Sequence, residues 1–263
     1  MVVPLQLTTN STPNHPFVAM IRRYTPLNGS DLTALARLLD RKLAVKKGKD
    51  IIVEGYEYKG LYIVESGFAV RYKLLHNGGR QLVSIVLPGD IIGFPSCFFE
   101  RAVFSVMAIA KMSLHYVTLD AFAGICRQNA SIATAMIWFA AGETALHVEH
   151  IVDTGRRAPL ERVAHFLLET HARLQAVGCA SASSFEMPLS QESIGDAIGL
   201  SAPHVNRMLR ELRTDGLIAM DGREITILDR AALQILGEFQ SSYLTRNPIP
   251  EREHKRPSIR QSA

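Results

Sequence analysis

The sequence predicts an α+β fold: an N-terminal barrel, roll or sandwich of β-strands, a long helix, and a C-terminal winged helix-turn-helix. Three observations lead to it. Short apolar runs alternate with glycines over residues 48–119, a helical period covers residues 132–153, and two short helical patterns are joined by Gly199-Leu200-Ser201. The chain has 263 residues, 47% hydrophobic and 21% charged, which is typical of a globular protein and excludes disorder throughout.

Composition also limits the partners and the compartment. The three cysteines are too few for a disulfide scaffold, and no apolar run is long enough to span a bilayer, so we expect no membrane partner. The N-terminus lacks the cationic start and apolar core of a secretory signal, which favours a cytoplasmic protein. The formal net charge of +4 permits a nucleic-acid partner without requiring one.

The first elements follow from local composition. Residues 1–16 are rich in Thr, Asn and Pro, and we expect a flexible arm. A short helix is expected up to Leu39, capped by Ser30 or Asp31. The β-rich domain is expected to cover residues 17–130, with a hairpin turn at Asn77-Gly78. Its strands are expected at residues 51–53, 61–64, 68–75, 81–87, 104–110 and 113–119.

A long helix is expected over residues 131–155, after a short one at 121–126. A narrow apolar seam runs along it at Ile132, Met136, Phe139 and Leu146. Such a seam is typical of a helix that pairs with another helix, which predicts a dimer; packing on the chain's own barrel is the alternative. The pattern breaks at residues 153–159, and we place the C-terminal domain at residues 156–236.

Residues 188–218 carry the motif that points to function. Ser190 can cap a first helix, Gly199 can take the positive φ that ends it, and Ser201 can cap a second helix. A small hairpin, the wing, is expected at residues 218–220 and 224–228. Two short helices joined in this way form a helix-turn-helix, whose second helix enters the major groove of DNA.

The second helix of this motif exposes polar and cationic side chains. Arg207 can read guanine or clamp a phosphate, and Asn206 can pair with adenine. Arg210 and Arg213 lie further along the helix, where we expect phosphate contacts. The predicted partner is therefore double-stranded DNA. The expected DNA-binding residues are Ser190, Gln191, Ser201, Ala202, His204, Asn206, Arg207, Arg210 and Arg213.

Over residues 20–235 the chain resembles the CRP/FNR family of transcription regulators. The resemblance rests on Gly67, the turn Pro88-Gly89-Asp90-Ile91-Ile92-Gly93, the long helix, and the pattern Ser-Gln-Glu-Ser-Ile-Gly…Gly-Leu-Ser…Val-Asn-Arg…Gly-Leu-Ile. It implies a jelly-roll-like β-roll that senses an effector, a dimerisation helix and a winged helix-turn-helix. It also implies a homodimer that binds near-palindromic operators and more often activates than represses, through RNA polymerase.

The resemblance also places an effector pocket, at Gly93, Phe94, Phe104, Ser105 and His147. In the cyclic-AMP branch a Glu follows the last glycine of the turn, where this chain has Phe94, and an Arg-Ser pair for the phosphate stands where it has Phe104-Ser105. A buried phosphate without its Arg would be unpaired, at a cost of several kcal/mol. We therefore do not expect cyclic AMP as the effector.

Other cofactors of the family are not expected either. Residues 1–50 contain no Cys, so the four-cysteine [4Fe–4S] site of the oxygen-sensing branch fails on ligand count. The haem ligands of the CO-sensing branch are replaced by Gly93 and Pro95. The effector stays unidentified. The alternatives are a regulator that needs no effector and one that responds to haem or redox state through other residues.

Two weaker hypotheses involve metals. Glu143, His147 and His150 share one face of the long helix. Two copies of this face in a parallel dimer could form a metal site or a proton-sensitive site, and the alternative is a solvated or inter-subunit polar stripe. A cupin-like metal enzyme would need a His-x-His pair on a strand, and the barrel offers only His76 and His115, so we expect no enzyme activity. The remaining residues, 237–263, are expected to form a basic, disordered tail.

Overall fold

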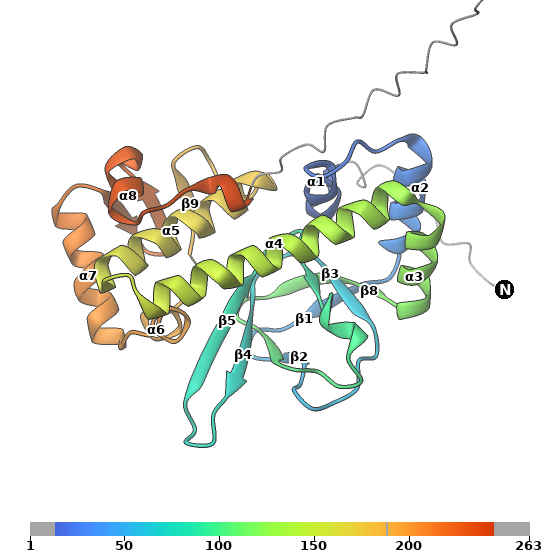
Figure 1. Cartoon of the computed structure of the whole chain (residues 1–263), viewed down its shortest axis with the longest axis horizontal. Helices are drawn as coiled ribbons and strands as arrows, with labels where there is room; N and C mark the ends of the chain where they lie inside the picture. The colour runs from blue at the N-terminus through green and yellow to red at the C-terminus, as the bar shows by residue number, and fades with distance from the viewer. Residues whose placement is uncertain (1–13, 188, 245–263) are drawn as a thin grey trace, which may run out of the picture.

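The computed structural model describes residues 14–187 and 189–244 (Figure 1). The N-terminal half is a roll of two four-stranded antiparallel sheets, in the strand orders β1-β8-β3-β6 and β2-β7-β4-β5. The strands are β1 (Lys42–Val45), β2 (Asp50–Ile52), β3 (Leu61–Ser66), β4 (Ala69–Leu74), β5 (Arg80–Val86), β6 (Ile91–Ile92), β7 (Ser105–Ala108) and β8 (Met112–Val117). The expected α+β fold with a β-roll is therefore confirmed.

Helices flank the roll and build the C-terminal half. They are α1 (Pro16–Arg22), α2 (Gly29–Leu38), α3 (Leu119–Gln128), α4 (Ala130–Gly155), α5 (Pro159–Ala176), α6 (Gln191–Ile198), α7 (Ala202–Thr214) and α8 (Arg230–Leu236), with short 3-10 turns η2 (Ser96–Phe98) and η3 (Ser241–Leu244). The C-terminal sheet has the order β10-β11-β9, from β9 (Ser184–Glu186), β10 (Ile218–Asp221) and β11 (Glu224–Ile227). Within the described ranges, no helix has the length and apolarity to cross a membrane.

The N-terminal helices differ from the expectation in two details. The expected arm, residues 1–16, ends in an ordered segment: His15 is 7% exposed and caps α1, which begins at Pro16. Residues 1–13 lie outside the described residues. Helix α1 is buried nearly all round, so its sequence shows no one-sided period. Helix α2 is capped by Asn28, with Asp31 at its third position completing a capping box.

The seam predicted on the long helix faces inward. Figure 1 shows α4 crossing the whole molecule, from the side of α2 and α3 to that of α6 and α7. Ile132, Met136, Phe139 and Leu146 are all buried within the single chain, so they form part of its own core instead of a dimer seam. The seam was predicted to face a partner because α4 is apolar on most of its circumference. Its sequence period alone does not show which apolar side packs against the roll.

A single hydrophobic cluster joins the roll to the C-terminal domain. Leu82, Ile85 and Leu87, on or next to β5, belong to the same buried cluster as Phe166 of α5 and Ile194 of α6. At the predicted boundary, Arg157 is 8% exposed and its guanidinium lies 2.6 Å from Asp153 and 2.9 Å from Glu149. The two halves are therefore packed together.

The first part of the expected tail is also ordered. Phe239 is 5% exposed, and the ring of Tyr243 stacks on that of His165 at 6.2 Å. These two aromatic anchors fix residues 237–244 against α5, which corrects the expectation of disorder from residue 237 onward. Residues 245–263 lie outside the described residues.

The tight turn between β3 and β4 generates a stability prediction. Gly67 has φ +84°, and an added Cβ would lie 2.3 Å from the backbone oxygen of Lys111. Gly78, in the turn between β4 and β5, has a similar φ of +81°, but a Cβ added there would have no atom within 4 Å. Gly78→Ala therefore measures backbone strain alone, about 1–2 kcal/mol, and Gly67→Ala adds a collision with the backbone. Urea unfolding should show the larger loss of unfolding free energy for Gly67→Ala; equal losses would contradict the prediction.

Candidate nucleic-acid interface

Local sequence explains how α6 and α7 are set at an angle to each other. The Ser190 hydroxyl accepts a hydrogen bond from the Ser193 amide at 3.1 Å and so starts α6. Gly199 ends the helix with φ 70°, in the left-handed region that glycine tolerates best. Pro203 lies in the first turn of α7, where its missing N–H costs nothing. Ser201 stands at the N-cap of α7, but its side chain makes no capping hydrogen bond.

The inner faces of both helices are buried as expected. Ile194 and Ile198 of α6 are each 3% exposed, and α7 contributes Val205, Met208, Leu209 and Leu212 to the same cluster. This packing fixes the opposite face of α7 outward. Arg207, Arg210 and Arg213 are exposed on it, while Ala202, His204 and Asn206 are partly buried.

The polar side chains of this outer face, which we call the α7 face, are hydrogen-bonded to one another. The Asn206 amide nitrogen donates to Gln191 of α6 at 3.0 Å, and its amide oxygen accepts from Arg210 at 3.4 Å. The Arg207 guanidinium lies 2.7 Å from the imidazole Nε2 of His204. The structure thus brings most of the predicted DNA-binding residues together, with Ser190 and Gln191 at the neighbouring N-terminus of α6.

Two arginines that were not among the predicted site residues hold α6 in place by contacts with its carbonyl end and its Asp196 side chain. Arg162 of α5 donates to the carbonyl of Ile198 at 3.2 Å, at the C-terminal end of α6. Arg80, at the start of β5, forms an ion pair with Asp196 of α6 through two nitrogens, at 2.9 and 2.6 Å. Asp196 and Arg80 are 116 residues apart, so no local pattern could have found the pair. A hairpin of the roll thereby touches the helix-turn-helix directly.

The wing also offers a cation. β10 and β11 are joined at Gly222 and Arg223, and Arg223 is exposed there. The sequence analysis predicted the hairpin but did not name this side chain. An exposed arginine at the tip of a wing is placed to meet a phosphate.

Phe94 and Phe104, both expected to line an effector pocket, lie in different parts of the roll's interior. Phe94 packs against the rings of Phe122 and Phe139, at 5.3 and 6.0 Å, in the cluster beneath α4. Phe104 lies against a different cluster, and the Ser105 hydroxyl accepts from the Glu54 amide at 3.0 Å. Phe94 and Phe104 thus belong to two different hydrophobic clusters.

A buried ion pair lies beside Phe104. Arg71 of β4 is paired with Glu143 of α4, with side-chain exposures of 3% and 9%, and its guanidinium lies 5.8 Å from the Phe104 ring. Arg71 also donates to the Ser84 hydroxyl at 3.2 Å. Burial raises the pKa of Glu143, but Arg71 and Arg173 outweigh it and hold the pKa of this carboxyl below its usual value. The pair is therefore charged on both sides at neutral pH.

Within the described part of the single chain, Glu143, His147 and His150 do not gather within metal-ligand distance of one another. Glu143 is taken by Arg71, and the two ring nitrogens of His150 lie 3.3 Å from the Val83 carbonyl and 3.1 Å from Glu169. Burial lowers the pKa of His147. Burial acts in the same direction on His150, but the Glu169 carboxylate outweighs it and raises the pKa of His150 above its usual value. Glu143 and His150 share a face of α4 but have different partners. They tie the helix to the roll and to α5.

Comparison with known families agrees with both halves of this structure. The family model for the cyclic nucleotide-binding domain matches residues 42–129, and that for the Crp-like helix-turn-helix domain matches residues 161–236. The first match reports likeness to the domain and not a bound nucleotide. These ranges contain the roll with α3, and the helix-turn-helix with its wing.

The chain is also similar to individual regulators. It is 31% identical to FixK2 from Bradyrhizobium japonicum, over 74% of this chain and 96% of that one, with a TM-score of 0.68. It is 26% identical to the transcriptional activator protein Anr of Pseudomonas protegens, over 77% of this chain and 83% of the relative. It is also 26% identical to the regulatory protein HlyX of Actinobacillus pleuropneumoniae, over 76% of this chain and 83% of that protein.

Anr is named as a transcriptional activator and HlyX as a regulatory protein, in agreement with the expectation of a regulator and not an enzyme. The DNA-binding fold, the roll and the similarity along most of the chain lead to one assignment. The protein belongs to the CRP/FNR family of DNA-binding transcription regulators.

Proposed function

We propose that this regulator acts in the cytoplasm as a homodimer that binds a near-palindromic operator by its base sequence. The observation that carries the proposal is the α7 face, where Asn206 and Arg207 stand beside the exposed Arg210 and Arg213. Asn206 offers both an amide donor and an acceptor for adenine, and Arg207 offers a forked donor edge for guanine. Arg210, Arg213 and the wing residue Arg223 supply charge for phosphates on either side.

The dimer is inferred from a second stripe on α4. We call it the α4 stripe: Ile137, Ala141, Thr144, Val148 and Ile151, all exposed in the single chain. Ile137 is 72% exposed, Val148 53% and Ile151 69%. The stripe recurs at alternating steps of four and three, the heptad period of two paired helices. A second copy of the chain is therefore the partner that fits it.

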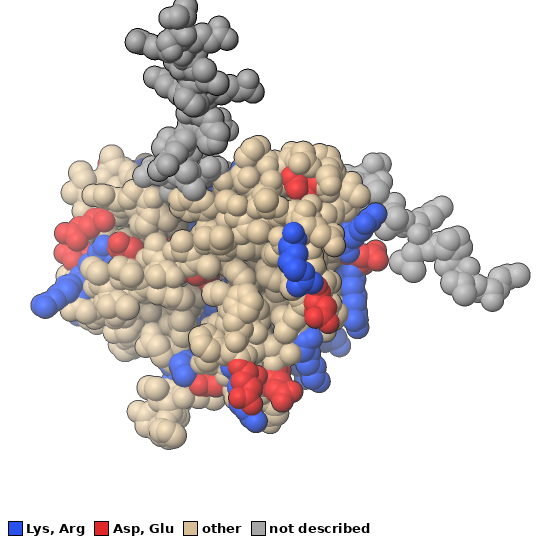
Figure 2. Space-filling view, turned by 45° about the vertical axis from the view of Figure 1, so that its right-hand side comes forward, with Lys and Arg blue, Asp and Glu red and all other residues tan. Residues whose placement is uncertain are grey.

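The surroundings of the α4 stripe are consistent with a covered surface. Charged side chains of both signs lie mostly toward the left, lower and right parts of the face shown in Figure 2, and its middle is largely uncharged. From Ala130 to Gly142, α4 itself carries no charged residue. Interface centres between protein subunits are depleted of charge in the same way. Pairing of α4 with its symmetry mate would set two α7 helices on one side of the dimer, as two half-sites about one helical turn apart require.

The buried pair of Arg71 and Glu143 favours a second candidate, a regulator that needs no effector. It occupies the junction between roll and long helix, next to Phe104, with both partners almost fully buried. A nucleotide phosphate at this place would compete with Glu143 for Arg71. Burial also raises the pKa of Cys97, Cys126 and Cys179, which keeps these thiols protonated and disfavours a thiol-based redox response.

The sign of regulation rests on similarity alone. Anr, which shares most of its length with this chain, is a transcriptional activator. We therefore propose activation, with RNA polymerase as the protein partner.

Selection of bound duplexes from a random DNA pool tests the function. The purified full-length chain is used with and without cyclic AMP. We expect the same near-palindromic motif in both conditions. A motif that is enriched only with cyclic AMP would contradict the exclusion of that nucleotide. Enrichment of duplexes that share no sequence motif, in both conditions, would contradict base-specific recognition.

Arg207→Ala should remove base reading. A well-placed base contact is worth about 1–3 kcal/mol, so the ratio of specific to non-specific affinity should fall by about 5- to 150-fold, while the subunits stay paired. Arg37→Ala, an equal charge change at an exposed site on α2, is the matched control and should leave that ratio unchanged. Quantitative titration of operator and scrambled DNA measures it. An unchanged ratio in Arg207→Ala would rule out this role.

Ile151→Asp should separate the subunits, because a carboxylate would be buried within the paired α4 stripes, at their C-terminal end. Ile235→Asp is the matched control, since Ile235 is 81% exposed on α8 and lies off the stripe. Sedimentation equilibrium should give dimers for the wild type and for the control, and monomers for Ile151→Asp. Operator affinity should fall together with the dimer. A dimeric Ile151→Asp variant would place the interface elsewhere.

A further inference from the structure

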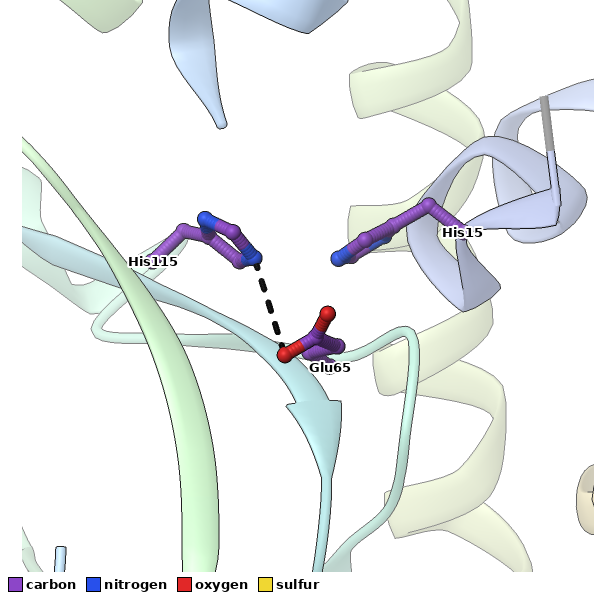
Figure 3. A group of neighbouring side chains, drawn as sticks. All are labelled: His15, Glu65 and His115. Carbon is purple, nitrogen blue, oxygen red and sulfur yellow. Dashed lines mark ion pairs between the residues drawn. The ribbon is translucent and has the colours of Figure 1, made fainter. Parts of the chain in front are cut away.

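Three potential metal ligands meet on the outer side of the roll, far along the chain from one another. His15 caps α1, Glu65 lies on β3 and His115 on β8. One ligand atom from each lies within 4.8 Å of the other two. Figure 3 shows the two imidazoles approaching from opposite sides, with the Glu65 carboxylate beneath the gap between them.

The strand pairing explains why Glu65 is aimed at this point. Ile63 on β3 pairs with His115 on β8, and the register then shifts between Val64 and Ser66. Glu65 is thus the extra residue of a β-bulge, a feature that redirects a side chain and often lies next to a functional site. The bulge places the Glu65 carboxylate 4.0 Å from Nε2 of His115.

Both histidines are buried with unpaired ring nitrogens. His15 is 7% exposed and His115 6%. Within the described residues, Nε2 of His15 has no hydrogen-bond partner, and the ring nitrogens of His115 make no hydrogen bond of normal geometry, although the backbone of Leu39 interacts with this ring. An unpaired polar atom in the interior costs free energy unless something satisfies it. Two buried imidazoles that lack a good hydrogen-bond partner and lie beside one carboxylate are a pattern that core packing does not explain.

We propose that His15, Glu65 and His115 bind one divalent first-row transition ion. Two imidazoles and one carboxylate are the ligand set of open zinc sites and of non-haem ferrous sites, whereas magnesium and calcium prefer oxygen alone. Burial and the neighbouring His115 lower the pKa of His15 to about 4, and burial lowers that of His115 as well. Both imidazoles are therefore neutral at pH 7, the state that binds metals.

Binding requires local rearrangements that the surroundings permit. Zn–N bonds of 2.0–2.1 Å put tetrahedral ligand atoms about 3.3 Å apart, so the three side chains must draw together. The ammonium of Lys42 lies 2.6 Å from Glu65 and must withdraw, which its 58% exposed side chain can do into solvent. The His15 Nδ1 accepts from the Phe17 amide at 3.1 Å. A metal at Nε2 shifts the ring proton to Nδ1 and ends that capping bond.

The ion would replace this capping bond by a cross-link from α1 to two strands of the roll. Helix α1 and the residues after it also reach other parts of the molecule. Tyr24 stacks on Trp138 of α4, with ring centroids 6.4 Å apart, and Arg23 donates to the carbonyl of Leu244 at 2.5 Å. Metal binding would therefore stabilise the N-terminal helix on both the roll and the long helix.

Calorimetric titration of the chelator-treated full-length chain with Zn²⁺ tests the site. We expect one ion per chain, and a loss of affinity of about 100-fold or more in His15→Ala, His115→Ala and Glu65→Gln. His76→Ala, at an exposed turn, is the matched control and should bind as the wild type does. Circular dichroism of each variant checks that it is folded. Glu65→Gln keeps the size of the side chain and its hydrogen bond from Ser113, so it is the variant least exposed to misfolding.

The absorption spectrum of bound Co²⁺ identifies the ligands. Only weak visible bands are expected, because nitrogen and oxygen donors lack the strong near-ultraviolet charge transfer of thiolates. Thiolate bands would assign the ion to the cysteines and overturn the proposal. Absence of stoichiometric binding, or equal affinity in the folded Glu65→Gln variant, would overturn it as well.

Lys42→Gln gives a result of opposite sign. It removes the cation that competes for Glu65, and it lies at a mostly exposed position where folding is not at stake. The affinity for Zn²⁺ should rise a few-fold if Glu65 is a ligand. An unchanged affinity would show that the carboxylate does not take part.

Discussion

The buried ion pair between Arg71 and Glu143 fixes the position of α4 on the roll, and the rest of the structure depends on that position. Both charged groups are removed from water, so each is stable only against the other. A slide of α4 by one helical turn, about 5.4 Å, would leave two unpaired charges inside the protein. Apolar packing alone would tolerate such a slide more easily, because α4 is apolar on most sides. The ion pair therefore gives the helix its register.

The register of α4 decides what the molecule presents to its surroundings. It buries Met136 and Phe139 against the roll and leaves Ile137 and Ile151 outside, on a stripe spaced for a second helix. At its far end it aligns His150 with Glu169 of α5 and so orients the C-terminal domain. Arg80 and Arg162 then hold α6 in place, and α6 carries the turn that aims α7 outward. The α7 face is thus connected to the roll through a series of polar contacts.

The sequence predicted the elements whose signals are local. The helix-turn-helix was predictable in detail because Ser190, Gly199 and Pro203 each act within one or two turns of their own position. Helix α1 and strand β9 were missed because one is buried all round and the other has only three residues. The exposed stripe of α4 was not predicted because the helix is apolar on two opposite sides, and the period alone does not show which side meets the roll. The contacts of Arg71 and Arg80 and the ligands of the proposed metal site join segments that are distant in the sequence. No spacing pattern in the sequence could have predicted them.

The continuous hydrophobic cluster between β5 and the helix-turn-helix has a consequence for how the protein unfolds. Leu82, Ile85 and Leu87 belong structurally to the roll, yet their apolar surface completes the core beneath α5 and α6. Part of the apolar surface that stabilises the DNA-binding domain is therefore supplied by the roll. The roll and the DNA-binding domain are therefore expected to unfold as one cooperative unit, and a fragment that starts at α5 would lack part of its interior.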